Sequence, residues 1–442
     1  MMNGLEALAS RSEKSLNSTK SSQKSARQLA WELIYEVDNS DTYSNLEVPR
    51  ALLVSNLEAR DKALVTNLVY GTLRMRGFLD GAIKRHIDRP LESVDFKVLT
   101  TLRMGAYQLL ILATPPHAAV NEIVDLAKIV CGKSASSFVN AIMRRLSENL
   151  DYSPSTLSEK YSHPEWIISA FRDCLKDEAL VVAQLEADNA VALPTLIAWP
   201  TLSKHQELLA AGAERVTDSK NAFTYRGNPG EIPAIKERRA GVQDLGSQII
   251  VEIFFETKSD GRKLRWLDLC AGPGGKAAYL ESLIGDDEMI ANDPSPARAK
   301  LVTQVLRRSE VMSFDGRDIP PEIGEFDRIL IDAPCTGLGA LRRRPEVRWR
   351  RQPSDLRSLT QLQRDLLDSA ATRVPRGGII GYSTCSPHLA ETKIQVSDFL
   401  RTHPNFRRVS VGMRADKDGD LQLWTFRDGT DCMFLSLLER VS

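Results

Sequence analysis

Two cysteines stand directly after apolar segments, in positions where a thiol could act as a nucleophile. Cys335 follows RILIDAP, and Cys385 follows GGIIGYST. A thiolate adds readily to an electron-poor carbon, so these positions suit covalent catalysis. Asp332, in the same segment as Cys335, adds a carboxylate that could hold a substrate or stabilise charge. The alternative for any cysteine is a small buried hydrophobe, which we expect for Cys131, Cys174 and Cys432.

A glycine-rich turn joins an apolar segment to a helical one in LDLCAGPGGKAAYL, residues 267–280. Glycines let a ligand approach the backbone where the N–H groups of a helix point outward. Asp293 ends the next apolar segment, where a carboxylate could accept hydrogen bonds from ribose hydroxyls. Asp315 could contact an adenine edge or could simply form a turn. A nucleoside cofactor is therefore predicted, with contacts from Cys270, Ala271, Gly272, Pro273, Gly274, Gly275, Lys276, Asp293, Arg298, Asp315 and Asp332.

The order of apolar and helical segments predicts three folded parts. Residues 26–149 repeat apolar residues at spacings of three and four, which indicates an all-helical domain. Residues 150–240 combine a helix with short strands and Pro- and Gly-rich turns, which favours a small α+β connector. Residues 241–442 alternate apolar strands with helices, as in a doubly wound, Rossmann-like α/β domain with a parallel sheet. Residues 1–25, rich in Ser and Lys, should form a disordered tail, either solvated or in weak contact with RNA.

Arginines gather in LRRRPEVRWRR, residues 341–351, close to Cys335. Guanidinium groups bind phosphates, and an indole ring can stack on a base, so this loop is a candidate RNA-binding segment. Its predicted contacts are Arg342, Arg343, Arg344, Arg348, Trp349 and Arg350. A solvated basic loop is the alternative. The helical domain offers a second basic set, either RNA-facing or ordinary surface charge: Arg74, Arg76, Lys84, Arg85, Arg144 and Arg145.

Composition narrows the class of protein. The net charge of +0 over 442 residues means that RNA binding must come from local clusters and not from total charge. No run of about 18 apolar residues and no secretory signal core is present, so we expect a soluble, cytoplasmic protein. The six cysteines are scattered, as free thiols would be. The six histidines lack metal-ligand spacing, His388 included, so no metal is expected. We expect a monomer.

The motifs DAPC and STCS, behind LCAGPGGK, resemble those of the RNA cytosine-C5 methyltransferases of the Sun/RsmB/NSUN group. The helical domain is similar to NusB, which points within that group to the RsmB (Sun, Fmu) family of bacterial 16S rRNA methyltransferases. The resemblance runs from about Ala26 to the C-terminus. This chain departs from the family where LIAWP replaces a strand resembling LRVN and where LCAGPGGK replaces CAAPGGK, and neither change touches a proposed reacting atom.

The resemblance implies a chemistry and a substrate. S-adenosylmethionine would be the cofactor, and the substrate a cytosine in small-subunit rRNA. Cys385 would attack C6 of that cytosine, Cys335 would help to release the product, and Asp332 would hold the N3 and amine edge. Lys276 and the region of Asp268 would complete the surroundings. Three alternatives stay open: attack by Cys335, as in DNA methyltransferases with a Pro-Cys dipeptide; a DNA substrate; and an RNA-binding module with an inert second domain.

Overall fold

A computed structural model describes residues 24–257 and 262–442, which form two compact units. One unit contains residues 24–73 and 82–152, and the other contains residues 74–81 and the described residues from 153 onward. The tail predicted for residues 1–25 lies outside the described residues up to residue 23. Within the described ranges, no helix is long and apolar enough to cross a membrane.

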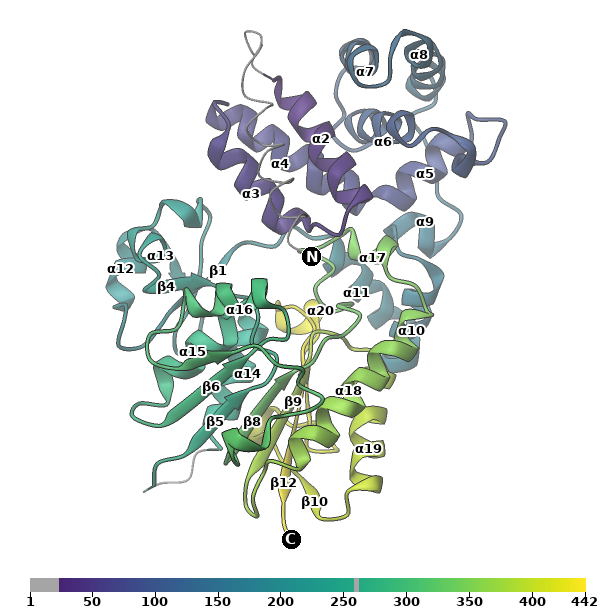
Figure 1. The fold of residues 1–442 in the computed structure, drawn as a ribbon. Coiled ribbons are helices and arrows are strands. Elements are labelled where there is room, and N and C mark those ends of the chain that lie inside the picture. The colour runs from purple at the N-terminus through teal and green to yellow at the C-terminus, as the bar shows by residue number, and fades with distance from the viewer. Residues whose placement is uncertain (1–23, 258–261) are drawn as a thin grey trace, which may run out of the picture. The chain divides into compact units, whose positions relative to one another are not determined.

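The first unit is built from helices, as predicted, and these are drawn in purple and blue in Figure 1. They are α2 (Ala26–Asn39), α3 (Ser44–Val54), α4 (Ala59–Arg74) up to residue 73, the last residues of α5 (Arg76–Lys84) from residue 82, α6 (Phe96–Leu110), α7 (Pro116–Val130) and α8 (Lys133–Ser147), with a short 3-10 helix at Leu91–Ser93. Ser25 caps α2 by accepting from Gln28 N–H, and Asp95 caps α6. Gly71 lets α4 meet α6, because a Cβ there would lie 2.0 Å from the Tyr107 ring.

The second unit begins with helices and a small sheet. The helices are α9 (Leu157–Tyr161), α10 (Glu165–Leu175) and α11 (Glu178–Asn189). The sheet has the order β2-β3-β1-β4 and is antiparallel at every described pairing. Its elements are β1 (Thr195–Ala198), α12 (His205–Ala210), β2 (Glu214–Arg215), β3 (Ala222–Thr224), α13 (Pro233–Lys236) and β4 (Ala240–Val242). Leu196, Phe223 and Leu208 lie in its own small apolar core.

A larger sheet carries the predicted chemistry. Its strand order is β10-β12-β9-β8-β5-β6-β7, and β11 pairs with β12. The strands are β5 (Arg265–Asp268), β6 (Glu288–Asn292), β7 (Glu310–Met312), β8 (Arg328–Asp332), β9 (Ile379–Thr384), β10 (Phe406–Val409), β11 (Leu421–Gln422) and β12 (Phe434–Arg440). The helices between them are α14 (Leu245–Phe255), α15 (Gly275–Leu283), α16 (Pro296–Thr303), α17 (Val347–Arg350), α18 (Asp355–Ala371), α19 (Lys393–Thr402) and α20 (Thr425–Asp428).

Helices cover both faces of this sheet. Successive residues of a strand point to opposite faces, so neighbours in the sequence pack against different helices. Trp266 of β5 joins an apolar core with residues of α14 and α15. Its neighbour Leu267 joins a second core with residues of α18 and α19, such as Leu366 and Phe399. The four central strands match those predicted from the sequence. The parallel sheet that we predicted is in fact mixed, since β12 pairs antiparallel with both β9 and β10.

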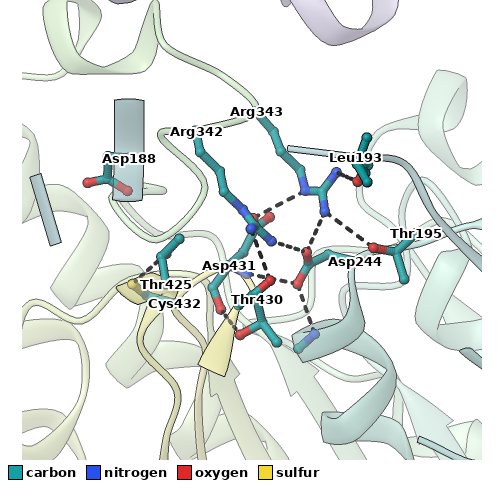
Figure 2. A network of polar contacts seen from close by, with 12 residues as sticks. Asp188, Leu193, Thr195, Asp244, Arg342, Arg343, Thr425, Thr430, Asp431 and Cys432 are labelled. Carbon is teal, nitrogen blue, oxygen red and sulfur yellow. Dashed lines mark hydrogen bonds and ion pairs between the residues drawn. The ribbon is translucent and has the colours of Figure 1, made fainter. Parts of the chain in front are cut away.

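Ion pairs within the protein hold the first part of the basic loop between β8 and α18. Arg342 donates to Asp431 at 2.9 Å and to Asp244 at 3.0 Å, and Arg343 donates to the same two carboxylates at 3.2 and 2.8 Å. Figure 2 shows both guanidinium groups pointing at this pair of carboxylates. Asp244 also caps α14, so the four charges join the loop to the start of α14 and to the segment before β12.

Arg348 is the most deeply held arginine of the loop, with no exposed surface. It donates to the carbonyls of Arg74, Ser162 and Asp188 and to Asn189 Oδ1, at 2.8 to 3.2 Å. Burial lowers the pKa of Arg348 to about 9. The N–H groups of Arg342, Arg343 and Arg348 donate to acceptors within the protein, and their contact with RNA phosphates stays a prediction.

Replacing Arg348 tests whether the loop is an internal anchor. Arg348→Ala leaves four acceptors without their donor, which costs about 3 kcal/mol or more. The midpoint of thermal unfolding should fall by at least about 5 °C. The control is Arg357→Ala on the exposed side of α18, which should leave the midpoint within about 1 °C. Equal midpoints for both variants in differential scanning calorimetry would contradict the anchor.

Candidate active site

The candidate site lies where β5, β8 and β9 end side by side. These strands are parallel and in register, with Asp268 beside Leu330 and Asp332 beside Ser383. Ligands of open α/β sheets bind beyond the carboxyl ends of the strands, at the point where the strand order reverses. Here β5 lies between β6 and β8, which places that position at the end of β5. The segments that follow β5, β8 and β9 therefore converge.

The two predicted cysteines lie together at this edge. The Sγ atoms of Cys335 and Cys385 are 3.4 Å apart, although the residues are 50 positions apart in the sequence. The hydrogen bond from Cys335 lowers the pKa of Cys385, and Arg344 and Lys276 lower it further. The same contact, together with burial, raises the pKa of Cys335. The pair is thus polarised: Cys385 is the more acidic thiol and accepts the hydrogen bond, and Cys335 keeps its proton and donates it.

Asp332 lies next to the cysteine pair, and each of its carboxylate oxygens accepts a hydrogen bond. Lys276 Nζ lies 2.8 Å from Oδ2, and Ser383 Oγ donates to Oδ1 at 3.0 Å. Burial acts to lower the pKa of Lys276, but the Asp332 carboxylate raises it above its usual value. Lys276 is therefore a cation beside the cysteines. Ser383 was not predicted, since a serine inside an apolar strand carries no signal in the sequence.

The glycine-rich turn packs against Asp293. Gly272 N–H donates to Asp293 Oδ2 at 3.1 Å, and a Cβ on Gly272 would lie 2.3 Å from that oxygen. Gly274 has φ of +115°, a conformation that favours glycine, and α15 begins at the next residue. Arg298 pairs with Asp293 at 3.2 Å and donates to the Gly272 carbonyl. The structure therefore brings together the predicted turn, Asp293 and Arg298.

Asp268 is a buried carboxylate at the end of β5 for which the chain provides little compensation. Among the described residues, neither of its oxygens has a well-aligned hydrogen-bond donor, although the backbone N–H of Cys270 interacts with the carboxylate. Burial, followed by the nearby charge of Asp332, raises the pKa of Asp268 to about 7. A buried polar group without a partner is costly, so an orphaned carboxylate here fits a ligand that brings its own hydrogen-bond donor. The amino group of an amino-acid-derived cofactor is such a donor.

Other predicted site residues lie elsewhere or are engaged otherwise. Asp315 is exposed and pairs with Arg317 at 2.6 Å, a contact that lowers the pKa of Asp315. The guanidinium of Arg76 lies 5.4 Å from the centre of the Trp349 ring. The predicted stacking plane of Trp349 therefore already has a cation on it. Arg344 and Arg350 are half-buried.

The remaining cysteines and His388 take no part in this cluster. Burial raises the pKa of Cys131, Cys174 and Cys432, as it does for small buried thiols. His388 Nδ1 accepts from the Ala390 N–H, and burial lowers its pKa. Over the described ranges, no group of three or more His, Cys, Asp or Glu side chains could hold a metal ion.

Comparisons with known proteins agree in both halves of the chain. Residues 256–439 match the family described as 16S rRNA methyltransferase RsmB/F, and residues 24–148 match the NusB family. A Mycobacterium tuberculosis protein that carries the name methyltransferase is 40% identical, with 94% of this chain and 97% of the relative covered. Ribosomal RNA small subunit methyltransferase B of Vibrio vulnificus is 31% identical, with 86% and 91% covered.

A solved structure shares the fold. The crystal structure of PH0851 has a TM-score of 0.81 at 24% identity, with 94% of this chain and 98% of that chain covered. The family models and the named relatives confirm the resemblance drawn from the sequence motifs. The chain belongs to the RsmB/F family of S-adenosylmethionine-dependent rRNA methyltransferases and carries a NusB-family domain before its methyltransferase domain.

Proposed function

We propose that this protein methylates carbon 5 of a cytosine in small-subunit rRNA, with Cys385 as the covalent nucleophile. The observation that carries the proposal is the contact of 3.4 Å between Cys335 and Cys385, next to Asp332. Methylation of an amine or a hydroxyl group needs no covalent nucleophile, whereas C5 of cytosine needs activation by addition at C6. The small-subunit methyltransferase B relatives support the choice of rRNA.

The cofactor is held, in this proposal, around the end of β5. The turn of residues 270–276 and the start of α15 offer backbone contacts, and the unpartnered carboxylate of Asp268 accepts from the amino group. Asp293 retains acceptor capacity for ribose hydroxyls, since each carboxylate oxygen accepts more than one hydrogen bond. When bound, S-adenosylmethionine supplies an electrophilic methyl group on a sulfonium.

The residues of the chain supply the covalent steps. The Cys385 thiolate forms a bond to C6 of the cytosine and thereby pushes an electron pair toward C5. Asp332 accepts from the exocyclic amine of the base, and Lys276 holds Asp332 in place at 2.8 Å. After methylation, a base, either water or the Cys335 sulfur in its thiolate form, takes the C5 proton; the C5–C6 double bond re-forms and the bond between C6 and Cys385 breaks to release the thiolate. We assign Cys335 to this release, because its thiol lies against Cys385.

The covalent roles predict opposite outcomes for the two cysteines. Cys335→Ala should accumulate a protein–RNA adduct that survives denaturation, because Cys385 still adds but the release step is impaired. Cys385→Ala should form none. Cys131→Ala in the helical unit is the control and should match the unsubstituted protein. Denaturing gels with labelled small-subunit rRNA and S-adenosylmethionine measure the adduct. If Cys385→Ala traps RNA and Cys335→Ala does not, then Cys335 is the nucleophile.

The polarised thiol pair also predicts a pH dependence. The rate of adduct formation should rise with pH as Cys385 loses its proton, with an apparent pKa below that of an ordinary cysteine. Cys335→Ala removes the donor that lowers this pKa, so the rising limb of the profile should move to higher pH. Quenched-flow measurement of adduct formation between pH 5.5 and 9.5, a range of about four units around a typical thiol pKa, gives both profiles. A profile that stays in place or moves to lower pH would refute the polarised pair.

A further inference from the structure

A buried carboxylate lies behind the cysteine pair, and the mechanism above does not use it. Glu391 ends a short 3-10 helix, Leu389–Glu391, in the segment that follows Cys385. Its side chain has no exposed surface. Its backbone is fixed as well, because the hydroxyl of Tyr382 donates to the Glu391 carbonyl at 2.8 Å. The side chain therefore has a defined place within the fold.

The carboxylate of Glu391 is part of a hydrogen-bonded network that includes the residues before and after Cys335. Thr336, directly after Cys335, donates its backbone N–H to Oε1 at 2.8 Å and its hydroxyl to Oε2 at 2.5 Å. Gln363 of α18 donates to Oε1 at 3.2 Å and also to the carbonyl of Pro334, directly before Cys335, at 2.9 Å. The neighbours of Cys335 in the sequence thus share one hydrogen-bonded network.

The same network reaches the second cysteine. The hydroxyl groups of Thr336 and Ser386 lie 3.1 Å apart, and Ser386 directly follows Cys385. Polar contacts therefore connect the residues next to both thiols, in addition to the contact between the sulfur atoms themselves. A displacement of Thr336 would move Cys335 relative to Cys385.

Within the part of the chain that the structure describes, no cation pairs with the buried Glu391 carboxylate. None of the ion pairs found among the described residues includes Glu391, although a buried carboxylate without a cation is costly. Its charge acts on one thiol of the pair: it contributes to the raised pKa of Cys335, after the contact with Cys385 and burial. A neutral side chain of equal size would fill the space without this effect on Cys335.

We propose that Glu391 is a positioning residue that holds the loop around Cys335, so that this sulfur faces Cys385 at contact distance. The consequence for catalysis, namely that Glu391 supports product release, rests on the role proposed above for Cys335. The effect of Glu391 on the position and pKa of the Cys335 thiol does not rest on that role, because it concerns the protein without RNA.

The first experiment uses the RNA-free protein. In a Cys385→Ser background, Glu391→Gln keeps the size of the side chain but removes its charge and alters its grip on Thr336. Alkylation of Cys335 by iodoacetamide, followed by peptide mass spectrometry, should begin at a pH lower by about one unit. The matched control is Glu281→Gln. Glu281 is also a buried carboxylate and accepts from the N–H groups of Arg307, Arg308 and Ser309, so its variant should leave the alkylation profile unchanged. An unchanged profile in Glu391→Gln would overturn the proposal.

A second variant protects this test against a loss of folding. Thr336→Val removes the hydroxyl that donates to Glu391 and keeps the backbone N–H, so the loop around Cys335 is held less firmly and Cys335 should be alkylated faster than in the parent at the same pH. If Glu391→Gln fails to fold, Thr336→Val decides the question. A Thr336→Val profile identical to that of the parent would then overturn the proposal.

The second experiment measures turnover with rRNA and S-adenosylmethionine. Glu391→Gln should accumulate the denaturation-resistant adduct that Cys335→Ala accumulates, and it should add nothing in the Cys335→Ala background, since both changes disable one step. If Cys335→Ala traps RNA but Glu391→Gln does not, the positioning role fails. If alkylation shifts but no variant traps RNA, the proposed covalent mechanism fails, whereas the positioning of Cys335 by Glu391 stands.

Discussion

The contact between the sulfur atoms of Cys335 and Cys385 is the constraint around which this domain is organised. Two sulfur atoms can lie 3.4 Å apart only if the segments that carry them leave neighbouring strands at corresponding positions. The parallel register of β8 and β9, with Asp332 beside Ser383, makes the two strands end side by side. The contact also separates the two thiols chemically, because sharing one proton favours a thiolate at Cys385 and a thiol at Cys335. Two residues of the same type thus acquire different acidities.

Polar contacts around the pair hold its loops in place. Glu391 and Gln363 secure the residues before and after Cys335. Further along the same loop, backbone hydrogen bonds connect Gly339 with Cys385 and Cys432, and a Cβ at Gly339 would lie 2.0 Å from the Cys432 carbonyl. The ion pairs of Arg342 and Arg343 then join the loop to the start of α14 and to the segment before β12 (Figure 2). Such preorganisation favours a reaction in which atoms must meet within a few tenths of an ångström.

The sequence predicted those parts of the site that are local. A glycine-rich turn, an acidic residue at the end of a strand, and a cysteine after an apolar segment are each readable within a few residues, and their order along the chain indicates a cofactor-binding α/β domain. The four central strands follow from the same apolar segments. The edge strand β10 and its neighbour β12 were not predicted, because β10 is only four residues long and β12 pairs antiparallel with both of its neighbours, outside the repeat of parallel strands.

The features that the sequence did not reveal depend on partners far away in the sequence. Six arginines in eleven residues indicate an exposed basic surface only if no internal acceptor is within reach. Asp244 and Asp431 lie 98 and 89 positions from Arg342, and the acceptors of Arg348 are mostly backbone carbonyls, which no side-chain pattern reveals. Glu391 was missed for the same reason, since its role follows from contacts with Thr336 and Gln363. Exposure and pairing are properties of the fold, not of local composition.

The central claim is that Cys385 forms the covalent bond that allows methylation of a cytosine in small-subunit rRNA. Bisulfite sequencing tests it most directly, in rRNA from cells that lack the gene and carry either the unsubstituted protein or Cys385→Ala. The account predicts one cytosine that is protected with the unsubstituted protein and unprotected with Cys385→Ala or with no protein. Protection that persists without the gene, or that Cys385→Ala restores fully, would contradict it.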